Sequence, residues 1–243
     1  MFRPAALFLA ASSTLLLAQD RLINGTPADP AQWPVSVYAS MSGARCSATL
    51  VGPQTLLIAS HCVKTGGEAV FSVNGQRVSS RCTRSPLYSH DSTADWALCL
   101  VGEPISGVPY ENINYDEQRL KVGDSLMLTG YGCIKPGGGG GNDGIFRIGE
   151  SKIRRLPTTY SNDTITEGGA ALCFGDSGGA AYFMDGRTGQ RWIVGINSRG
   201  DIKTTSYLSS VFTDDAKSFF KQWAEKNGQL ICGIHLEAEG CRE

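Results

Sequence analysis

Short apolar runs separated by turn-forming residues constrain the fold of this 243-residue chain more than any other feature. Each run is about four to six residues long, and clusters of Gly, Pro, Ser and Asn separate one from the next. Examples are residues 35–38, 55–59, 96–101, 126–129 and 192–196. Many short runs with this punctuation are typical of the strands of a sandwich or barrel. We therefore predict an all-β fold.

One segment near the carboxyl end, Thr213–Trp223, departs from the strand pattern and predicts a helix. Thr213 is a suitable N-cap, acidic residues follow it in the first turn, and Gly228 is a suitable stop. Apolar residues recur at helical spacing at positions 216, 219, 220 and 223. We expect an α-helix over about 213–227, followed by a tail over 228–243.

Composition argues against several classes of protein. The net charge is −1, so no basic field invites nucleic acid, and 41% hydrophobic residues with 19% charged argue against disorder. The one long apolar run, residues 1–18, has the layout of a secretory signal peptide and is short for a membrane anchor. We expect a secreted protein, or a periplasmic one in a Gram-negative bacterium, with no membrane contact after signal removal.

The expected export of the chain bears on how its eight cysteines are interpreted. An even number in an oxidising compartment predicts four disulfides, although 105 pairings are possible. The chain has no C-x-x-C pair and its three histidines are scattered, so a zinc site is not expected. The cysteines are at positions 46, 62, 82, 99, 133, 173, 232 and 241.

A single low-complexity segment, Pro136 followed by five glycines at 137–141, interrupts the second half of the chain. Consecutive glycines are unsuited to the interior of a helix or strand. Because strand-like patterns continue on both sides, we predict a mobile surface loop within one domain rather than a linker between two.

The densest chemical signal is the pentapeptide Gly175–Gly179, with sequence GDSGG. A serine between glycines can sit on a tight turn with an exposed hydroxyl, and the neighbouring N–H groups can stabilise an oxyanion. The same residues satisfy the nucleophile elbow of α/β-hydrolases, in which an acid and then a histidine follow the serine. Here His61 and Asp95 precede Ser177, and the strand–helix alternation of that fold is missing.

These motifs resemble those of chymotrypsin/trypsin-like serine endopeptidases, and the matches extend over nearly the whole chain after the leader. Residues 21–25 resemble the activation junction, 95–98 the aspartate motif and 175–179 the nucleophile motif. Further matches, in the family's order, are residues 33–37, 46–50, 60–62 and 129–132. The resemblance implies two packed antiparallel β-barrels with a C-terminal α-helix. Barrel one would cover about 22–115 and barrel two about 116–212, within a peptidase domain over 22–243.

The resemblance implies a catalytic triad that hydrolyses peptide bonds through an acyl-enzyme. Ser177 would be the nucleophile, His61 its general base and then acid, and Asp95 the residue that orients the imidazole. The N–H groups of Gly175 and Ser177 would form the oxyanion hole. The other histidines, His90 in a polar loop and His235 in the tail, are not expected to take part.

The resemblance also implies synthesis as a zymogen. Cleavage after Arg21 would remove a short propeptide, residues 19–21, and free the α-amino group of Leu22. In the family this group enters the protein and pairs with the aspartate beside the nucleophile, here Asp176. A buried carboxylate needs such a partner.

The implied binding pocket departs from the family pattern. Ala171 stands at the floor where trypsin-like members carry Asp, and Arg199 stands where the family usually has Trp. An apolar or small residue before the cut bond is therefore expected, so a separate protease would cut after Arg21. Asp201 is the one acid nearby that could reverse this preference. The substrate-binding residues implied are Ala171, Leu172, Phe174, Ser198, Gly200 and Ser206.

Four disulfides follow from the resemblance and from the cysteines that remain. Cys46–Cys62 matches the family's bridge beside the catalytic histidine. Cys173 lacks its usual partner, so Cys133 is the best remaining candidate. Cys82–Cys99 would staple adjacent strands, and Cys232–Cys241 would close the tail.

No cofactor or metal is expected, since residues 68–77 lack the cluster of carboxylates found in the family's calcium loop. The expected partners are polypeptide substrates, an activating protease and protein protease inhibitors, with the chain itself a monomer. Two alternatives remain, namely a catalytically inactive binding protein on the same scaffold and a secreted lipase or esterase.

Overall fold

The computed structural model describes residues 22–41, 44–73, 75–141, 143–235 and 238–242. The signal peptide and propeptide predicted for residues 1–21 lie outside this range. Among the described residues, no helix is both long and apolar enough to cross a membrane.

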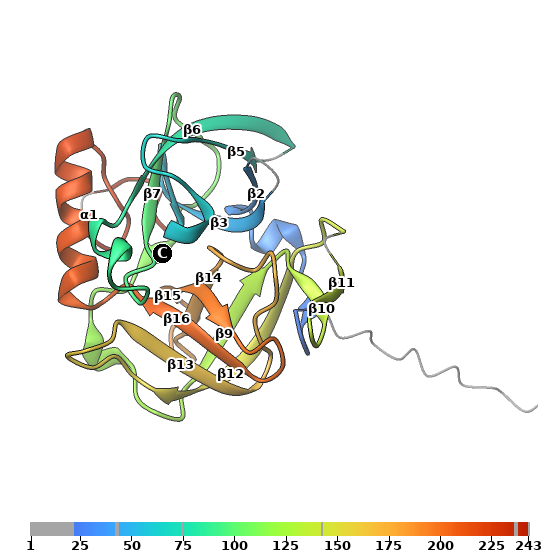
Figure 1. The fold of residues 1–243 in the computed structure, drawn as a ribbon. Coiled ribbons are helices and arrows are strands. Elements are labelled where there is room, and N and C mark those ends of the chain that lie inside the picture. The colour runs from blue at the N-terminus through green and yellow to red at the C-terminus, as the bar shows by residue number, and fades with distance from the viewer. Residues whose placement is uncertain (1–21, 42–43, 74, 142, 236–237, 243) are drawn as a thin grey trace, which may run out of the picture.

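The first barrel is a closed antiparallel sheet with strand order β2-β3-β4-β7-β6-β5 (Figure 1). Alternating burial along β5, in which every second residue is buried, is the period-two pattern of a strand with one face in a core. The strands are β2 (Ser36–Met41), β3 (Ala44–Gly52), β4 (Thr55–Ile58), β5 (Glu68–Val73), β6 (Gln76–Arg84) and β7 (Ala97–Val101).

The second barrel closes because β9 pairs with both β12 and β14. Its order is β9-β12-β13-β16-β15-β14, again antiparallel throughout, so the predicted all-β fold with two barrels is confirmed. The strands are β9 (Ser125–Gly130), β12 (Arg147–Arg155), β13 (Asp163–Gly169), β14 (Ala180–Met184), β15 (Arg191–Gly200) and β16 (Thr205–Ser210).

Both ends of the range predicted for barrel one belong to the second barrel instead. Strand β1 (Thr26–Pro27) pairs with β12, and β8 (Asn112–Ile113) runs parallel to β15. Leu22 is buried in the core of the second barrel. The predicted range of about 22–115 is therefore wider than the first closed sheet.

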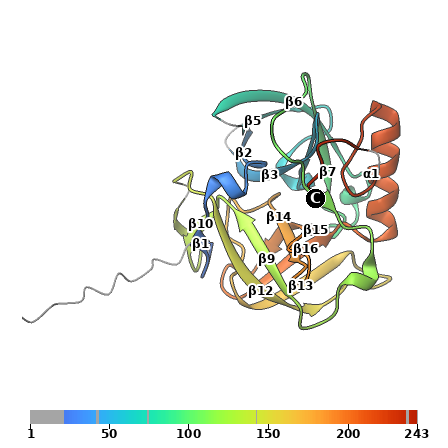
Figure 2. The same cartoon turned by 180° about the vertical axis from the view of Figure 1, so that it is seen from behind.

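The predicted C-terminal helix is α1 (Asp214–Asn227), which stands beside the first barrel in Figures 1 and 2. The Thr213 side chain accepts from the Ala216 N–H, and Gly228 ends the helix in the left-handed conformation. Its buried residues are Ala216, Phe220, Trp223 and Ala224. The described residues also form four short 3₁₀ turns, η1 (Pro30–Gln32), η2 (Ser60–Cys62), η3 (Pro86–Ser89) and η4 (Glu117–Arg119).

The glycine-rich segment differs from its prediction. It forms a two-stranded antiparallel hairpin, β10 (Cys133–Lys135) and β11 (Gly139–Gly141), rather than an irregular loop. The hairpin is held by contacts from outside itself, such as the Gly137 N–H that donates to the Ile202 carbonyl at 3.1 Å. Tertiary contacts thus order a segment whose own residues favour no regular structure.

All four predicted disulfide pairs are present. Cys46–Cys62 joins β3 to η2, Cys82–Cys99 joins neighbouring strands, and Cys133–Cys173 links the hairpin to the segment before Ser177. Cys232–Cys241 closes the tail that follows α1.

Candidate active site

The turn that carries Ser177 packs against the first barrel, and this contact explains one glycine of the motif. A side chain at Gly178 would bring its Cβ within 2.3 Å of the Ser47 carbonyl oxygen, and Gly178 has φ of +83°. The Ser47 N–H donates to the Ser177 carbonyl at 2.7 Å. Only glycine fits this close approach at positive φ, so the sequence GDSGG places Ser177 at the junction of the barrels.

The carbonyl groups of the turn are held while two of its N–H groups stay free. The Asp176 carbonyl accepts from the Gly179 N–H at 3.0 Å and from the Asn197 side-chain amide at 3.1 Å. Within the described part of the chain, the N–H groups of Gly175 and Ser177 donate to no acceptor. These are the two donors predicted for an oxyanion hole, and they remain available for a ligand.

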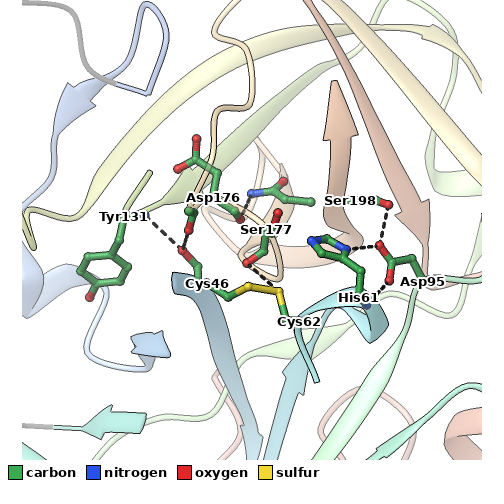
Figure 3. The surroundings of a disulfide bond; sticks show 11 residues. Cys46, His61, Cys62, Asp95, Tyr131, Asp176, Ser177 and Ser198 are labelled. Atoms are coloured by element: carbon green, nitrogen blue, oxygen red, sulfur yellow. Dashed lines mark hydrogen bonds and ion pairs between the residues drawn. A yellow bond between two sulfur atoms is a disulfide. The ribbon is translucent and has the colours of Figure 1, made fainter. Parts of the chain in front are cut away.

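His61 and Asp95 lie beside this turn in the arrangement drawn in Figure 3. His61 Nδ1 is 2.7 Å from Asp95 Oδ2, and the His61 backbone N–H donates to Asp95 Oδ1 at 2.8 Å. The imidazole lies between Asp95 and Ser177. The His61 side chain is 33% exposed whereas Asp95 is 1% exposed, so a buried carboxylate pairs with an accessible imidazole.

The second barrel holds Asp95 in place across the interface. Ser198 Oγ donates to Asp95 Oδ2 at 2.6 Å, and the Asp95 N–H donates to Ser209 Oγ at 3.3 Å. The indole N–H of the next residue, Trp96, donates to the Ser210 carbonyl at 3.1 Å. The site therefore forms only when the two barrels pack together.

The other histidines are engaged elsewhere. His90 is exposed and its Nδ1 lies 3.0 Å from Ser89 Oγ, while His235 Nδ1 accepts from the Ile231 N–H at 2.9 Å. Neither lines the cavity beside Ser177.

A cavity of about 290 Å³ opens beside Ser177, and its lining agrees only in part with the predicted pocket. Ala171 and Ser206 do not line it. Ala171 is fully buried, and its N–H donates to the Ile23 carbonyl at 2.9 Å. Ser206 is also buried, and its Oγ accepts from the N–H of the lining residue Leu172 at 3.0 Å. The lining consists of His61, Leu172, Cys173, Phe174, Ser177, Ser198, Arg199, Gly200 and Ile202. A larger hollow, about 750 Å³ between α1 and residues 83–89, contains none of the candidate catalytic residues.

The lining includes three residues outside the predicted catalytic and substrate-binding sets, Cys173, Arg199 and Ile202. Of these, only Ile202 has no sequence-based expectation of any kind. It has φ of +58°, where a β-branched residue is an outlier that costs about 1–3 kcal/mol. No local signal marks Ile202, because an isolated isoleucine in a polar loop is unremarkable by itself.

Asp201, the neighbour of Ile202, is not part of the cavity lining. Partial burial of the Asp201 carboxylate raises its pKa, but hydrogen bonds from the N–H groups of residues 203–205 outweigh this effect and lower the pKa of Asp201 to about 2.

Asp176 is fully buried and has no charged hydrogen-bonding partner among the described residues. Its carboxylate accepts from the Gly132 N–H at 2.8 Å and from the Cys173 N–H at 2.9 Å. Loss of hydration raises the pKa of Asp176 to about 7, although these N–H groups and the charge of Arg147 act in the opposite direction. Leu22 is also fully buried.

The described residues contain one group with metal-ligating atoms close together, namely Cys46, His61 and Cys62. Both sulfur atoms are joined in a disulfide, so neither supplies the thiolate that a metal requires. The site thus consists of a hydroxyl, an imidazole, a buried carboxylate and two free N–H groups.

Two antiparallel barrels with these groups at their junction have the architecture of trypsin-like serine proteases. A family model described as Trypsin matches residues 22–223, and the chain belongs to that family. The α/β-hydrolase fold of the lipase alternative is excluded, because its parallel sheet and crossover helices are incompatible with two antiparallel barrels.

Curated relatives are similar at low identity. Transmembrane protease serine 11E of Mus musculus is 26% identical over 85% of this chain and 54% of its own length. Transmembrane protease serine 9 of Rattus norvegicus is 28% identical over 75% of this chain and 20% of its own length. Kallikrein-2 of Homo sapiens is 27% identical over 54% of this chain and 59% of its own length. The chain thus matches only part of each of these relatives.

Proposed function

We propose that this chain is a serine endopeptidase in which Ser177 attacks the carbonyl carbon of a peptide bond. His61 takes the hydroxyl proton as the bond forms and then gives it to the leaving amine. Asp95 holds the imidazole in the tautomer that leaves its other nitrogen free for Ser177. The N–H groups of Gly175 and Ser177 stabilise the oxyanion, and water then hydrolyses the acyl-enzyme.

The observation that carries this proposal is the pairing of His61 with a buried Asp95 beside a serine turn. In the described part of the chain, the N–H groups of Gly175 and Ser177 in that turn donate to no acceptor. A neutral hydroxyl is a weak nucleophile near pH 7, so it needs a base held within reach. An oxyanion also needs donors that are fixed before the reaction begins. The paired imidazole and the two N–H groups beside Ser177 support the proposal that this region between the barrels serves both purposes.

We further propose that an apolar side chain of small to medium size precedes the cut bond. The cavity lining combines Leu172, Phe174 and Ile202 with no carboxylate. Burial of an apolar side chain there contributes about 1.5–3 kcal/mol, whereas an unpaired cation loses several kcal/mol of hydration, roughly. Cleavage mainly after Lys or Arg would contradict this preference.

Activation by cleavage between Arg21 and Leu22 is part of the same proposal. The Ile23 carbonyl accepts a hydrogen bond from the Ala171 N–H. Ala171 is two residues before Cys173, whose N–H donates to the Asp176 carboxylate. A new α-amino group at Leu22 would supply the cation that the buried Asp176 lacks among its described partners. A trypsin-like protease is the suitable activator, because the proposed pocket does not accept Arg21. Four disulfides support an oxidising, extracytoplasmic location.

The test uses chain that has been cleaved by trypsin and sequenced to establish Leu22 as its amino terminus. We expect this material to cleave peptides and to react with an organophosphonate at Ser177. Ser177→Ala and His61→Ala should each lower kcat by about four to six orders of magnitude, because nucleophile and base act as a unit.

Circular dichroism of both variants is the control for folding. If Ser177 stays unlabelled in folded, cleaved protein, the chain is a catalytically inactive binding protein on the same scaffold. If protein that begins at Gln19 is already fully active, the role assigned to the Leu22 α-amino group is wrong.

A further inference from the structure

The glycine hairpin β10–β11 contacts two apolar residues that line the cavity beside Ser177, Phe174 and Ile202. A Cβ at Gly138 would lie 2.6 Å from Cε2 and 2.8 Å from Cδ2 of Phe174. The Gly137 N–H donates to the Ile202 carbonyl at 3.1 Å. The turn of the hairpin therefore contacts two separate parts of the cavity lining.

The backbone of Phe174 is held separately from its ring. Its carbonyl accepts from the Cys133 N–H at 2.9 Å, and its own N–H lies 3.1 Å from Cys133 Sγ. The Cys133–Cys173 disulfide ties the hairpin to the residue before Phe174. Phe174 as a residue, by contrast, is 62% exposed, so a contact on one side of its ring is enough to bias the rotamer.

We propose that Gly138 is a positioning residue for the ring of Phe174, which the resemblance already places among the substrate-binding residues, in the reaction proposed above, on which this inference rests. Because Gly138 has no side chain, the ring of Phe174 rests against the hairpin backbone at the rim of the cavity. There it contacts the side chain that precedes the cut bond and favours a branched or longer apolar side chain over alanine. A methyl group at Gly138 would occupy the position of the ring and displace it from the rim.

The chain offers a matched control for this test. Gly137 and Gly138 are adjacent and have φ of +82° and +93°, so alanine is strained to a similar degree at both. A Cβ at Gly137, however, meets no atom within 4 Å, whereas a Cβ at Gly138 collides with Phe174. The difference between Gly138→Ala and Gly137→Ala therefore isolates the displacement of the ring.

The experiment measures kcat and KM of cleaved enzyme on two peptides that differ only in Ala or Leu before the cut bond. Titration with an organophosphonate gives the concentration of active sites. We expect Gly138→Ala to lower the Leu-to-Ala ratio of kcat/KM about tenfold relative to Gly137→Ala. The active-site concentration should be the same in both variants.

A double-mutant cycle assigns the effect to the ring. If Gly138 acts through Phe174, then Phe174→Ala should lower the same ratio and Gly138→Ala should have no further effect on it in that background. Equal ratios for the Gly138 and Gly137 variants would overturn the inference, and so would a full Gly138→Ala effect without Phe174. Wild-type protein that neither cleaves the peptides nor reacts with the organophosphonate would instead overturn the proposed function.

Discussion

Asp176 is the residue whose energetics should depend most on whether the chain has been cleaved. Its carboxyl group is fully buried, and loss of hydration raises its pKa from 3.8 to about 7. Between these two values the folded chain holds a proton that the unfolded chain has released. The free energy of unfolding therefore decreases as pH rises through this window. The expected loss in uncleaved chain is on the order of 4 kcal/mol at 1.36 kcal/mol per pKa unit.

The measurement is urea unfolding between pH 4 and pH 7.5 in a Ser177→Ala background. Arg21→Gln keeps the chain uncleaved, and adding Asp176→Asn should remove the decrease, because the amide does not titrate. Cleaved chain should also lack the decrease, since the α-amino group of Leu22 would stabilise the carboxylate. Equal slopes with and without Asp176→Asn would contradict this account.

At the scale of elements, α1 shows how far local chemistry specifies a boundary. The hydroxyl of Thr213 accepts from the Ala216 N–H at 3.4 Å and satisfies one of the otherwise unpaired donors of the first turn. Thr213→Ala should lower the free energy of unfolding by about 1 kcal/mol. Thr213→Ser keeps the hydroxyl and should cost much less, as measured by urea unfolding of the Ser177→Ala protein. Equal losses for the two substitutions would mean that the cap contributes little.

The hairpin β10–β11 shows the opposite case. Its glycines have no preference for a strand, so nothing local predicted one. Cys173, which is bonded to Cys133 of the hairpin, the Ile202 carbonyl and the ring of Phe174 all lie more than 30 residues away in sequence from the hairpin turn. Contacts of this kind are absent from any local pattern.

At the scale of the molecule, Glu111 joins three parts of the chain. Its N–H donates to the Leu50 carbonyl of the first barrel at 3.1 Å. Its carboxylate accepts from Arg191 Nε of the second barrel at 2.9 Å and from Arg242 Nε of the tail at 3.2 Å. Glu111 is fully buried, so the carboxylate depends on these arginines for compensation.

Glu111→Gln should lower the free energy of unfolding by about 3–5 kcal/mol, because it leaves the buried Arg191 without its counter-charge. Arg242→Gln is the matched control. Arg242 is 25% exposed and Arg191 still faces Glu111 in that variant, so the loss should be clearly smaller. Urea unfolding in the Ser177→Ala background measures both. If Arg242→Gln lowered the free energy of unfolding as much as Glu111→Gln, the greater importance assigned to the Glu111–Arg191 pair would be wrong.

The sequence by itself determined the all-β class, the helix at the carboxyl end and the family, because each depends on local features. Short apolar runs separated by turn residues indicate strands, and Thr213 and Gly228 indicate helix ends. The residues around His61 and Ser177 occur in the family's order. The four disulfides could be paired once that order was recognised.

Only the tertiary structure decided which distant segments share one core and one cavity. Closure of the second sheet brings Leu22 and β1 into a barrel more than 100 residues away in sequence, contrary to the predicted range. The same packing buries Ala171 behind the cavity wall and puts Ile202 into its lining. The physical reason is that local patterns depend on the period and propensity of neighbouring residues, whereas burial depends on closure of the two barrels and their contact.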